Sequence, residues 1–203
     1  MRKLLLAATA IATVALTSQV QAAPVTVDPG VLSSQGDINA VFVFRDAADA
    51  SQLVRQGSSG VLFNNQVDAI GSTVSAGSGN GVVTFTLNNL TTGTSFSTGV
   101  ADTGPGGDSF YHAVYSSDFS TFGVGALSAV AAAAVANLSG AVTFVGFEDL
   151  RDGDYDYNDL IFAFSPVVAT QTPVPEPASL ALFGMGLLGM SLARRRKSAS
   201  SGR

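Results

Sequence analysis

Residues 148–159 hold the densest group of side chains in this sequence that could bind a metal ion or carry acid–base chemistry. They comprise six carboxylates and one asparagine against a single arginine. Crowding like charges costs free energy unless a cation lies among them. Carboxylate and amide oxygens at alternate positions suit Ca²⁺, which takes about 6–8 oxygen ligands. The stretch therefore predicts a calcium site. Its principal candidate ligands are Asp152, Asp154, Asp156 and Asp159, and its further candidates are Glu148, Asp149 and Asn158.

The spacing of these carboxylates excludes an EF-hand. Asp152, Asp154 and Asp156 match the first three alternate ligand positions of such a loop, but Tyr157 replaces its glycine and Ala163 replaces its final glutamate. The alternative to a metal site is a solvated acidic turn, whose Asp and Asn side chains accept hydrogen bonds from backbone amides. The sequence leaves both open, and we favour calcium.

Strands must position this loop, because apolar runs at 141–145 and 160–164 flank it and predict a β-hairpin with an acidic tip. Alternating apolar and polar residues at 82–87 indicate a half-buried strand. The glycine-rich stretch 77–81 is predicted to be a turn. Some eight to ten short strands with Gly and Asn between them predict an all-β sandwich or jelly roll. The other expected strands are 38–45, 61–63, 70–74, 94–98, 111–115 and 121–124.

An alanine-rich segment, residues 127–138, interrupts the strand pattern. Alanine is the best helix former, and six apolar residues of the segment fall on one helical face. We expect one helix here, packed on an edge or an end of the sandwich. Its buried face would comprise Leu127, Val130, Ala131, Ala134, Val135 and Leu138.

Composition excludes several classes of partner and site. The predicted core, residues 23–170, holds three arginines and fourteen carboxylates, so its formal charge is −11, whereas the whole chain carries −5. So acidic a domain is a poor partner for nucleic acid, whose phosphates require a basic face. The chain has no cysteine, which excludes disulfides, thiolate nucleophiles and Cys-zinc sites.

The sequence predicts no enzyme. His112 is the single histidine, and we expect it to be a packed residue; with Asp108 it could contribute to a second polar site. No Gly-x-Ser-x-Gly elbow surrounds any serine. A glycosidase with paired carboxylates is an alternative, as is a carbohydrate-binding module, but the chain has no tryptophan as a sugar platform. Tyr155 and Tyr157 are the aromatic pair that such a module could use, although packing within the fold is the expected role.

The N-terminal residues 1–22 have the features of a secretory signal peptide. A positively charged start precedes the apolar residues 4–16, and small residues follow. We predict that signal peptidase cleaves after Ala22, because cleavage after Ala23 would place Pro24 next to the scissile bond. The alternative, an N-terminal membrane anchor, needs about 20 apolar residues.

The C-terminal region 174–197 has three parts in a fixed order: a short proline motif, the apolar stretch 178–193 and a basic cluster. A helix of this apolar length spans about 24 Å, slightly less than the hydrocarbon core of a membrane. The whole arrangement resembles the PEP-CTERM sorting signal of Gram-negative bacteria. The motif is Pro175, Glu176 and Pro177, and the basic cluster is Arg194, Arg195, Arg196 and Lys197.

This resemblance implies a route through the cell envelope. Residues 178–193 would hold the exported chain transiently in the inner membrane, with the basic cluster in the cytoplasm. An exosortase would then process the motif and transfer the protein to the cell surface or the exopolysaccharide matrix. A permanent single-span anchor is the alternative. Residues 166–173 are expected to form an extended linker, and 198–203 a tail.

The core resembles the bacterial domain of unknown function 4114 family. The acidic loop carries the signature Phe-Glu-Asp-Leu, residues 147–150, followed by Asp-Tyr-Asn-Asp-Leu, residues 156–160. The similarity continues in residues 42–45, 62–65 and 106–113. The chain departs from the family at 151–153 and 105–108, and the alanine-rich segment looks like an insertion. The resemblance implies an all-β fold and names no reaction.

Together these observations predict an exported β-sandwich domain at residues 23–165, stabilised by calcium. We expect a structural or adhesive protein of the cell surface or biofilm matrix, with surface polysaccharide as a candidate partner.

Overall fold

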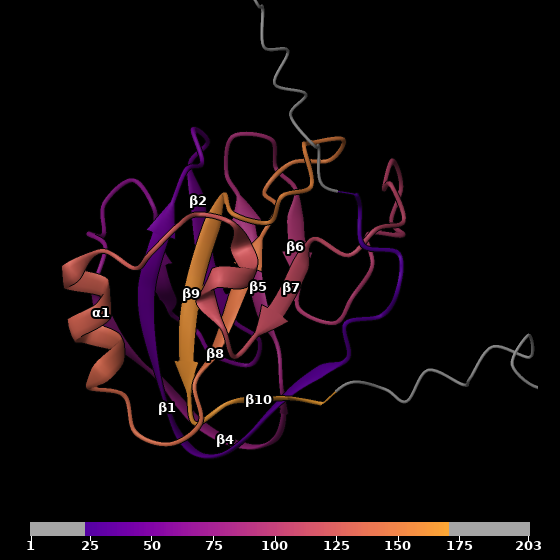
Figure 1. Cartoon of the computed structure of the whole chain (residues 1–203). Helices are drawn as coiled ribbons and strands as arrows, with labels where there is room; N and C mark the ends of the chain where they lie inside the picture. Colours follow the sequence, from indigo (N-terminus) through magenta and orange to yellow (C-terminus); the bar gives the residue numbers. More distant parts are fainter. Residues whose placement is uncertain (1–22, 171–203) are drawn as a thin grey trace, which may run out of the picture.

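Two antiparallel β-sheets face each other in the computed structural model of the protein, which describes residues 23–170 (Figure 1). The larger sheet has the strand order β10-β1-β9-β8-β7, and β4 also pairs with β1. Its strands are β1 (Val31–Arg45), β4 (Thr73–Val83), β7 (Ala113–Ser116), β8 (Thr143–Phe147), β9 (Leu160–Ser165) and β10 (Val168–Thr170). The smaller sheet has the order β3-β2-β5-β6. Its strands are β2 (Ser51–Arg55), β3 (Val61–Asn64), β5 (Phe85–Asn89) and β6 (Ser95–Ser97). The predicted all-β fold is confirmed.

The main core lies between the two sheets and is rich in phenylalanine. Phe42 of β1 stacks on Phe162 of β9 with ring centroids 5.2 Å apart. Phe85 of β5 stacks on Phe164 of β9 at 3.9 Å, which joins the smaller sheet to the larger one. Phe85 is fully buried, as is Leu87 two residues later. The alternation predicted for this strand is therefore confirmed, because β5 buries one face.

A second apolar cluster covers the outer face of the larger sheet. Strand β9 is buried along its whole length, since its other face packs under the 3₁₀ helix η1 (Phe119–Phe122) and the helix α1 (Ala129–Ala136). The predicted alanine-rich helix is confirmed, and it lies at the side of the sandwich beside β1, where it joins this outer apolar cluster (Figure 1). Within it Ala131 is fully buried, whereas Val130 is 62% exposed, against expectation. The smallest apolar side chain occupies the contact, and this lets the helix lie close to the sheet.

Three other segments differ from the sequence-based expectation. Residues 77–81 are part of β4, because they pair with the first half of the long strand β1. A Cβ at Gly79 would lie 2.7 Å from the Cβ of Ser34, so glycine permits this close approach. Residues 121–124 form the end of η1 and its cap instead of a strand. The side chain of Asp118 accepts a hydrogen bond from the backbone of Ser120 and starts this 3₁₀ helix. The third segment is the linker predicted at 166–173: its residues 168–170 form β10 on β1.

The predicted hairpin with an acidic tip is confirmed. Strands β8 and β9 pair antiparallel from Phe147 opposite Leu160, so residues 148–159 form the connecting loop, called the acidic loop below. Arg45 at the end of β1 also pairs with Leu160, which places the β1–β2 connection beside this loop. Figure 1 shows the acidic loop at one end of the sandwich and β10 near the other.

The predicted signal peptide and sorting signal, including Pro175, Glu176, Pro177, Arg194, Arg195 and Arg196, lie outside the described residues. Within residues 23–170, no helix is long and apolar enough to cross a membrane.

Candidate metal site

Glu148 and Asp149 leave the end of β8 and turn into the fold, and each is only 2% exposed. The backbone N–H of Glu148 donates to the carbonyl oxygen of His112 at 3.0 Å, which continues the β7–β8 pairing by one more bond. The backbone N–H of Asp149 donates to Asp159 Oδ2 at 2.8 Å, and that of Tyr155 donates to Glu148 Oε2 at 2.9 Å. The loop thus folds over its own first carboxylates.

The carboxylates of the acidic loop form two overlapping groups. Oxygens of Glu148, Asp149 and Asp159 lie within 4.8 Å of one another, and so do oxygens of Glu148, Asp154 and Asp156. Ca²⁺ binds oxygens at about 2.3–2.6 Å, so oxygens on opposite sides of one ion lie about 5 Å apart. Both groups have this span. Glu148 belongs to both and is therefore the central residue of the site.

Burial raises the pKa of several of these carboxylates. Desolvation, followed by the charges of Asp159 and Asp154, raises the pKa of Glu148 to about 9. Desolvation, followed by Asp159 and Asp49, raises the pKa of Asp149 to about 7. Desolvation also raises the pKa of Asp159. A cation among these oxygens would stabilise the charged forms that burial disfavours.

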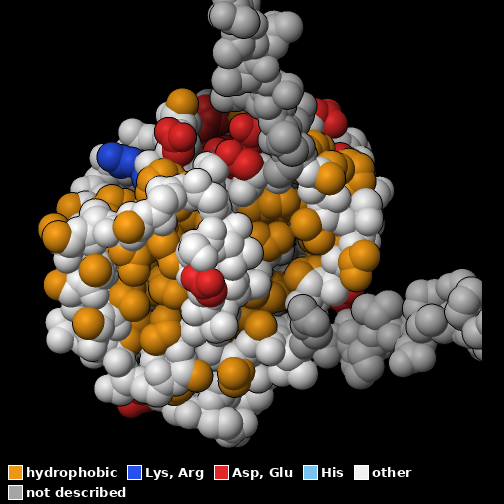
Figure 2. All heavy atoms as spheres, viewed as in Figure 1, with side chains coloured by type: hydrophobic (Ala, Val, Ile, Leu, Met, Phe, Trp, Pro, Cys, Tyr) orange, Lys and Arg blue, Asp and Glu red, His pale blue; other side chains and the backbone are white. Residues whose placement is uncertain are grey.

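Among the described residues, no arginine forms a salt bridge with the carboxylates of either group. Arg151 lies in the loop itself, but its guanidinium binds Asp102, with Nε 2.5 Å from Oδ2 and Nη2 3.1 Å from Oδ1. Arg45, at the same end of the sandwich, donates to the backbone carbonyl of Asn65. Figure 2 shows acidic side chains gathered at this end of the molecule. Their mutual repulsion is therefore not offset by a neighbouring side-chain ion pair.

The structure brings together five of the seven predicted ligand residues. Asp152 is exposed and belongs to neither group. Asn158 lies beside the site but binds another loop residue: its backbone N–H and its Nδ2 donate to the two carboxylate oxygens of Asp156, at 3.2 and 2.6 Å. It therefore fixes the position of Asp156.

Residues from the smaller sheet complete the surroundings of Asp149, and sequence reasoning missed them. Ser51 Oγ donates to Asp149 Oδ2 at 3.3 Å. Asn89 Nδ2 donates to the Asp149 carbonyl and to Asp49 Oδ2, both at 2.9 Å. Ser51 and Asn89 are paired across β2 and β5. Both residues lie at strand ends, and this position could have indicated them only if the alignment of the two sheets had been known.

A second polar group, Asp102, Asp108 and His112, lies beside the acidic loop. His112 is 1% exposed, stacks on Phe96 at 3.9 Å and contacts Asp108 through Nε2 at 2.9 Å. The packed histidine predicted from the sequence is confirmed. Tyr155 donates from its hydroxyl to Asp108 Oδ2 at 3.3 Å. Together with the Arg151–Asp102 pair, these bonds fix the acidic loop to residues 102–112.

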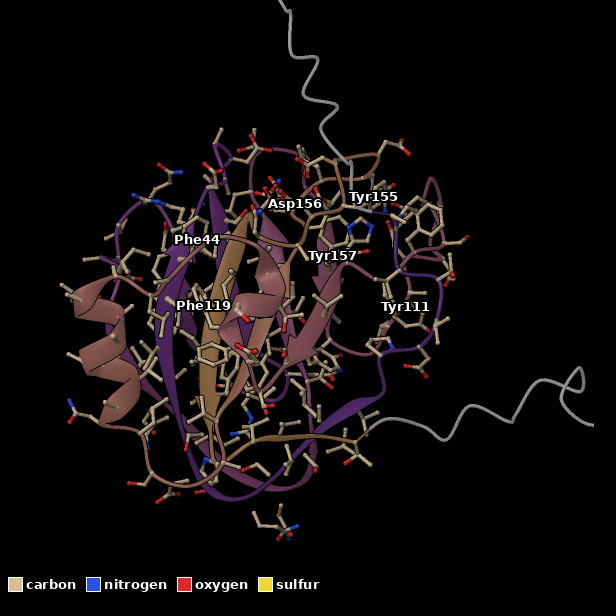
Figure 3. The ribbon with its side chains drawn as sticks, viewed as in Figure 1. Phe44, Tyr111, Phe119, Tyr155, Asp156 and Tyr157 are labelled. Carbon is tan, nitrogen blue, oxygen red and sulfur yellow. The ribbon has the colours of Figure 1, made fainter. Side chains whose placement is uncertain are left out.

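Tyr155 and Tyr157 do not form a sugar-binding platform. They are 8% and 5% exposed, and Figure 3 shows them inside the loop end of the fold near Asp156. The hydroxyl of Tyr157 accepts a hydrogen bond from the backbone of Val25 at 2.7 Å. Both tyrosines have positive φ, 55° and 57°, and their rings pack inward. The expected packing role is confirmed.

Comparison with known protein families identifies the C-terminal region. A family model for the PEP-CTERM protein-sorting motif matches residues 173–197. The chain carries a PEP-CTERM sorting motif. No curated protein and no solved structure matches the chain. The resemblance of the core to the domain of unknown function 4114 family therefore has no support from these comparisons.

The PEP-CTERM motif implies an extracellular protein of a Gram-negative bacterium, exported and sorted by an exosortase. The match covers the region 174–197 in which the sequence predicted this signal. In an exported protein the acidic loop is in contact with the ions outside the cytoplasm. Its carboxylate oxygens are of the kind that a hard cation binds.

Proposed function

We propose that this PEP-CTERM protein is a structural or adhesive component of the cell surface or exopolysaccharide matrix, and that its acidic loop binds Ca²⁺. The observation that carries the proposal is the pair of buried carboxylates, Glu148 and Asp149, which have no arginine partner within residues 23–170. They lie in a chain that carries an export-dependent sorting motif.

The residues fit calcium in kind and in spacing. Glu148, Asp149 and Asp159 would hold the ion with carboxylate oxygens, and Asp154 and Asp156 offer further oxygens from the same loop. Bound Ca²⁺ would supply positive charge and no redox or acid–base chemistry. An ion held by Glu148, Asp149 and Asp159 would join the start and the end of the twelve-residue loop, and an ion held by Glu148, Asp154 and Asp156 would join its start and its middle.

The proposed role is non-catalytic. A glycosidase needs one carboxyl group protonated and one charged on either side of a sugar-sized cleft. Here Glu148 and Asp149 are adjacent in sequence, buried, and bonded to the backbone of Tyr155 and to Ser51. These contacts support a structural use of both groups.

The proposal is tested in a host that expresses the sorting peptidase, by following where the full chain resides. Wild type is expected at the cell surface or in the matrix, and EDTA should release it or make it sensitive to protease. Glu176→Ala, which breaks the sorting motif, should stay in the membrane fraction. Glu148→Gln should be sorted but should lose the response to calcium. Surface delivery of the Glu176→Ala variant at the wild-type level would refute sorting, and EDTA-insensitive wild type would refute the calcium role.

A further inference from the structure

Three valines form an exposed apolar patch where β4, β1 and β10 lie side by side. Val31, Val82 and Val168 are 38%, 66% and 52% exposed. Ser33 of β1 pairs with Val82 on one side and Val168 on the other, so these side chains leave the same face of the sheet. Directly opposed Cβ atoms in a sheet are about 5 Å apart. Val82 and Val168 therefore lie on either side of Ser33, and Val31 lies two residues from Ser33 along β1. These three valines together with Ser33 form one surface, called the β10 patch below.

The β10 patch lies in an uncharged part of a strongly acidic domain. The segments 31–36, 79–83 and 168–170 contain no charged residue, although residues 23–170 carry a formal charge of −11. Exposed apolar surface without surrounding charge is typical of a protein contact. The acidic loop lies toward the other end of the sandwich (Figure 1), so the patch is also separate from the candidate calcium site.

The short segment between β10 and the sorting motif limits how far the motif can lie from the β10 patch. Strand β10 ends at Thr170, and the sorting motif is matched from residue 173. Four residues lie between Thr170 and Pro175, and the five residue steps from one to the other span at most about 18 Å when fully extended. A peptidase that binds the Pro175–Pro177 motif must therefore approach the folded domain at β10.

We propose that the β10 patch is a docking surface for the peptidase that processes the sorting motif, and that the folded domain is part of the sorting signal. The inference rests on the proposed sorting of this chain. The partner would present a complementary apolar surface next to its peptide-binding site. An apolar contact suits the patch, because Val31, Val82 and Val168 offer side chains but no charge.

The test compares processing rates of the full chain by pulse-chase in cells that contain the sorting peptidase. Val82→Asp and Val168→Asp are each expected to slow processing about five- to tenfold, as for the loss of a central contact in an interface. Val82 lies on β4, so its variant leaves the three residues of β10 unchanged. Val67→Asp is the matched control, because Val67 is 79% exposed and lies in the connection between β3 and β4. It should be processed at the wild-type rate.

Two further measurements separate the possible outcomes. A photo-crosslinking residue at position 82 should capture the peptidase, and one at position 67 should not; capture of lipid alone from position 82 would mean that the membrane covers the patch and would overturn the inference. Equal thermal melts of the Val82→Asp and Val67→Asp variants show that folding is not the cause of slow processing. If Glu176→Ala is blocked while all three valine variants match wild type, docking is wrong but sorting stands. If Glu176→Ala is processed normally, sorting itself fails.

Discussion

At the residue scale, the candidate site depends on Glu148. Its carboxylate lies in both acidic groups, accepts a hydrogen bond from the backbone of Tyr155, and is 2% exposed. Burying a charge without a partner is costly, and the group either keeps its proton or acquires a cation. Metal-free protein with a protonated Glu148 and calcium-bound protein with a charged Glu148 therefore lead to different predictions.

In the metal-free protein, we expect Tm to fall as the pH rises from about 5 to about 8. The pKa of Glu148 is raised to about 9 and that of Asp149 to about 7, above ordinary carboxyl values near 4. The folded state therefore binds these protons more tightly than the unfolded state. Their contribution to stability is complete below about pH 4 and is lost as the pH rises through the raised values. Melts in EDTA at several pH values measure this, and a Tm that rises over the interval would contradict it.

Gly153 lies against Glu148, and its replacement should disturb the site directly. A Cβ at this position would overlap Glu148 Oε1. We expect Gly153→Ala to lower the free energy of unfolding by about 1–3 kcal/mol, as overpacking does, and to weaken calcium binding. Gly60→Ala is the control, since a Cβ there meets nothing within 4 Å. Equal denaturant midpoints for the two variants would show that the position of Glu148 is not constrained as described.

At the element scale, the long strand β1 and the β8–β9 hairpin position the site. β1 pairs with β9, β4 and β10, and this pairing draws residues 77–81 into a strand despite their turn-like sequence. The local pattern was enough to predict the hairpin, because apolar runs flank residues 148–159. It could not predict that Ser51 and Asn89 reach Asp149, since that contact depends on how two sheets align.

The helix α1 gives a test of the packing on the outer sheet face. Ala131 is fully buried there, whereas the adjacent Ala132 is exposed. Ala131→Leu should destabilise the domain by about 1–3 kcal/mol, because added methylenes do not fit between helix and sheet. Ala132→Leu should change stability by less than about 0.5 kcal/mol. Chemical denaturation of both variants measures the difference. Equal denaturation midpoints would show that α1 does not pack on the sheet through Ala131.

At the scale of the whole molecule, two functions are assigned to different parts of one sandwich. The acidic loop lies at one end, and β10, which leads into the PEP-CTERM motif, lies near the other (Figure 1). If the chain is held or processed from its C-terminal side, the candidate calcium site faces away from that attachment. The sequence predicted both features because each is local: a dense carboxylate run and a three-part tail. It could not predict the β10 patch, since Val31, Val82 and Val168 meet only after folding.

The central claim is that the acidic loop binds calcium, and calorimetric titration of residues 23–170 tests it most directly. Wild type should bind Ca²⁺ saturably, and calcium at a hundredfold excess over Kd should add about 2.7 kcal/mol to the free energy of unfolding. Glu148→Gln should not bind, yet its metal-free Tm at about pH 8 should exceed that of wild type, because glutamine is buried neutral without the proton that Glu148 must take up on folding. No binding heat, with identical melts in calcium and EDTA, would contradict the account and leave the loop as a turn closed by its own hydrogen bonds.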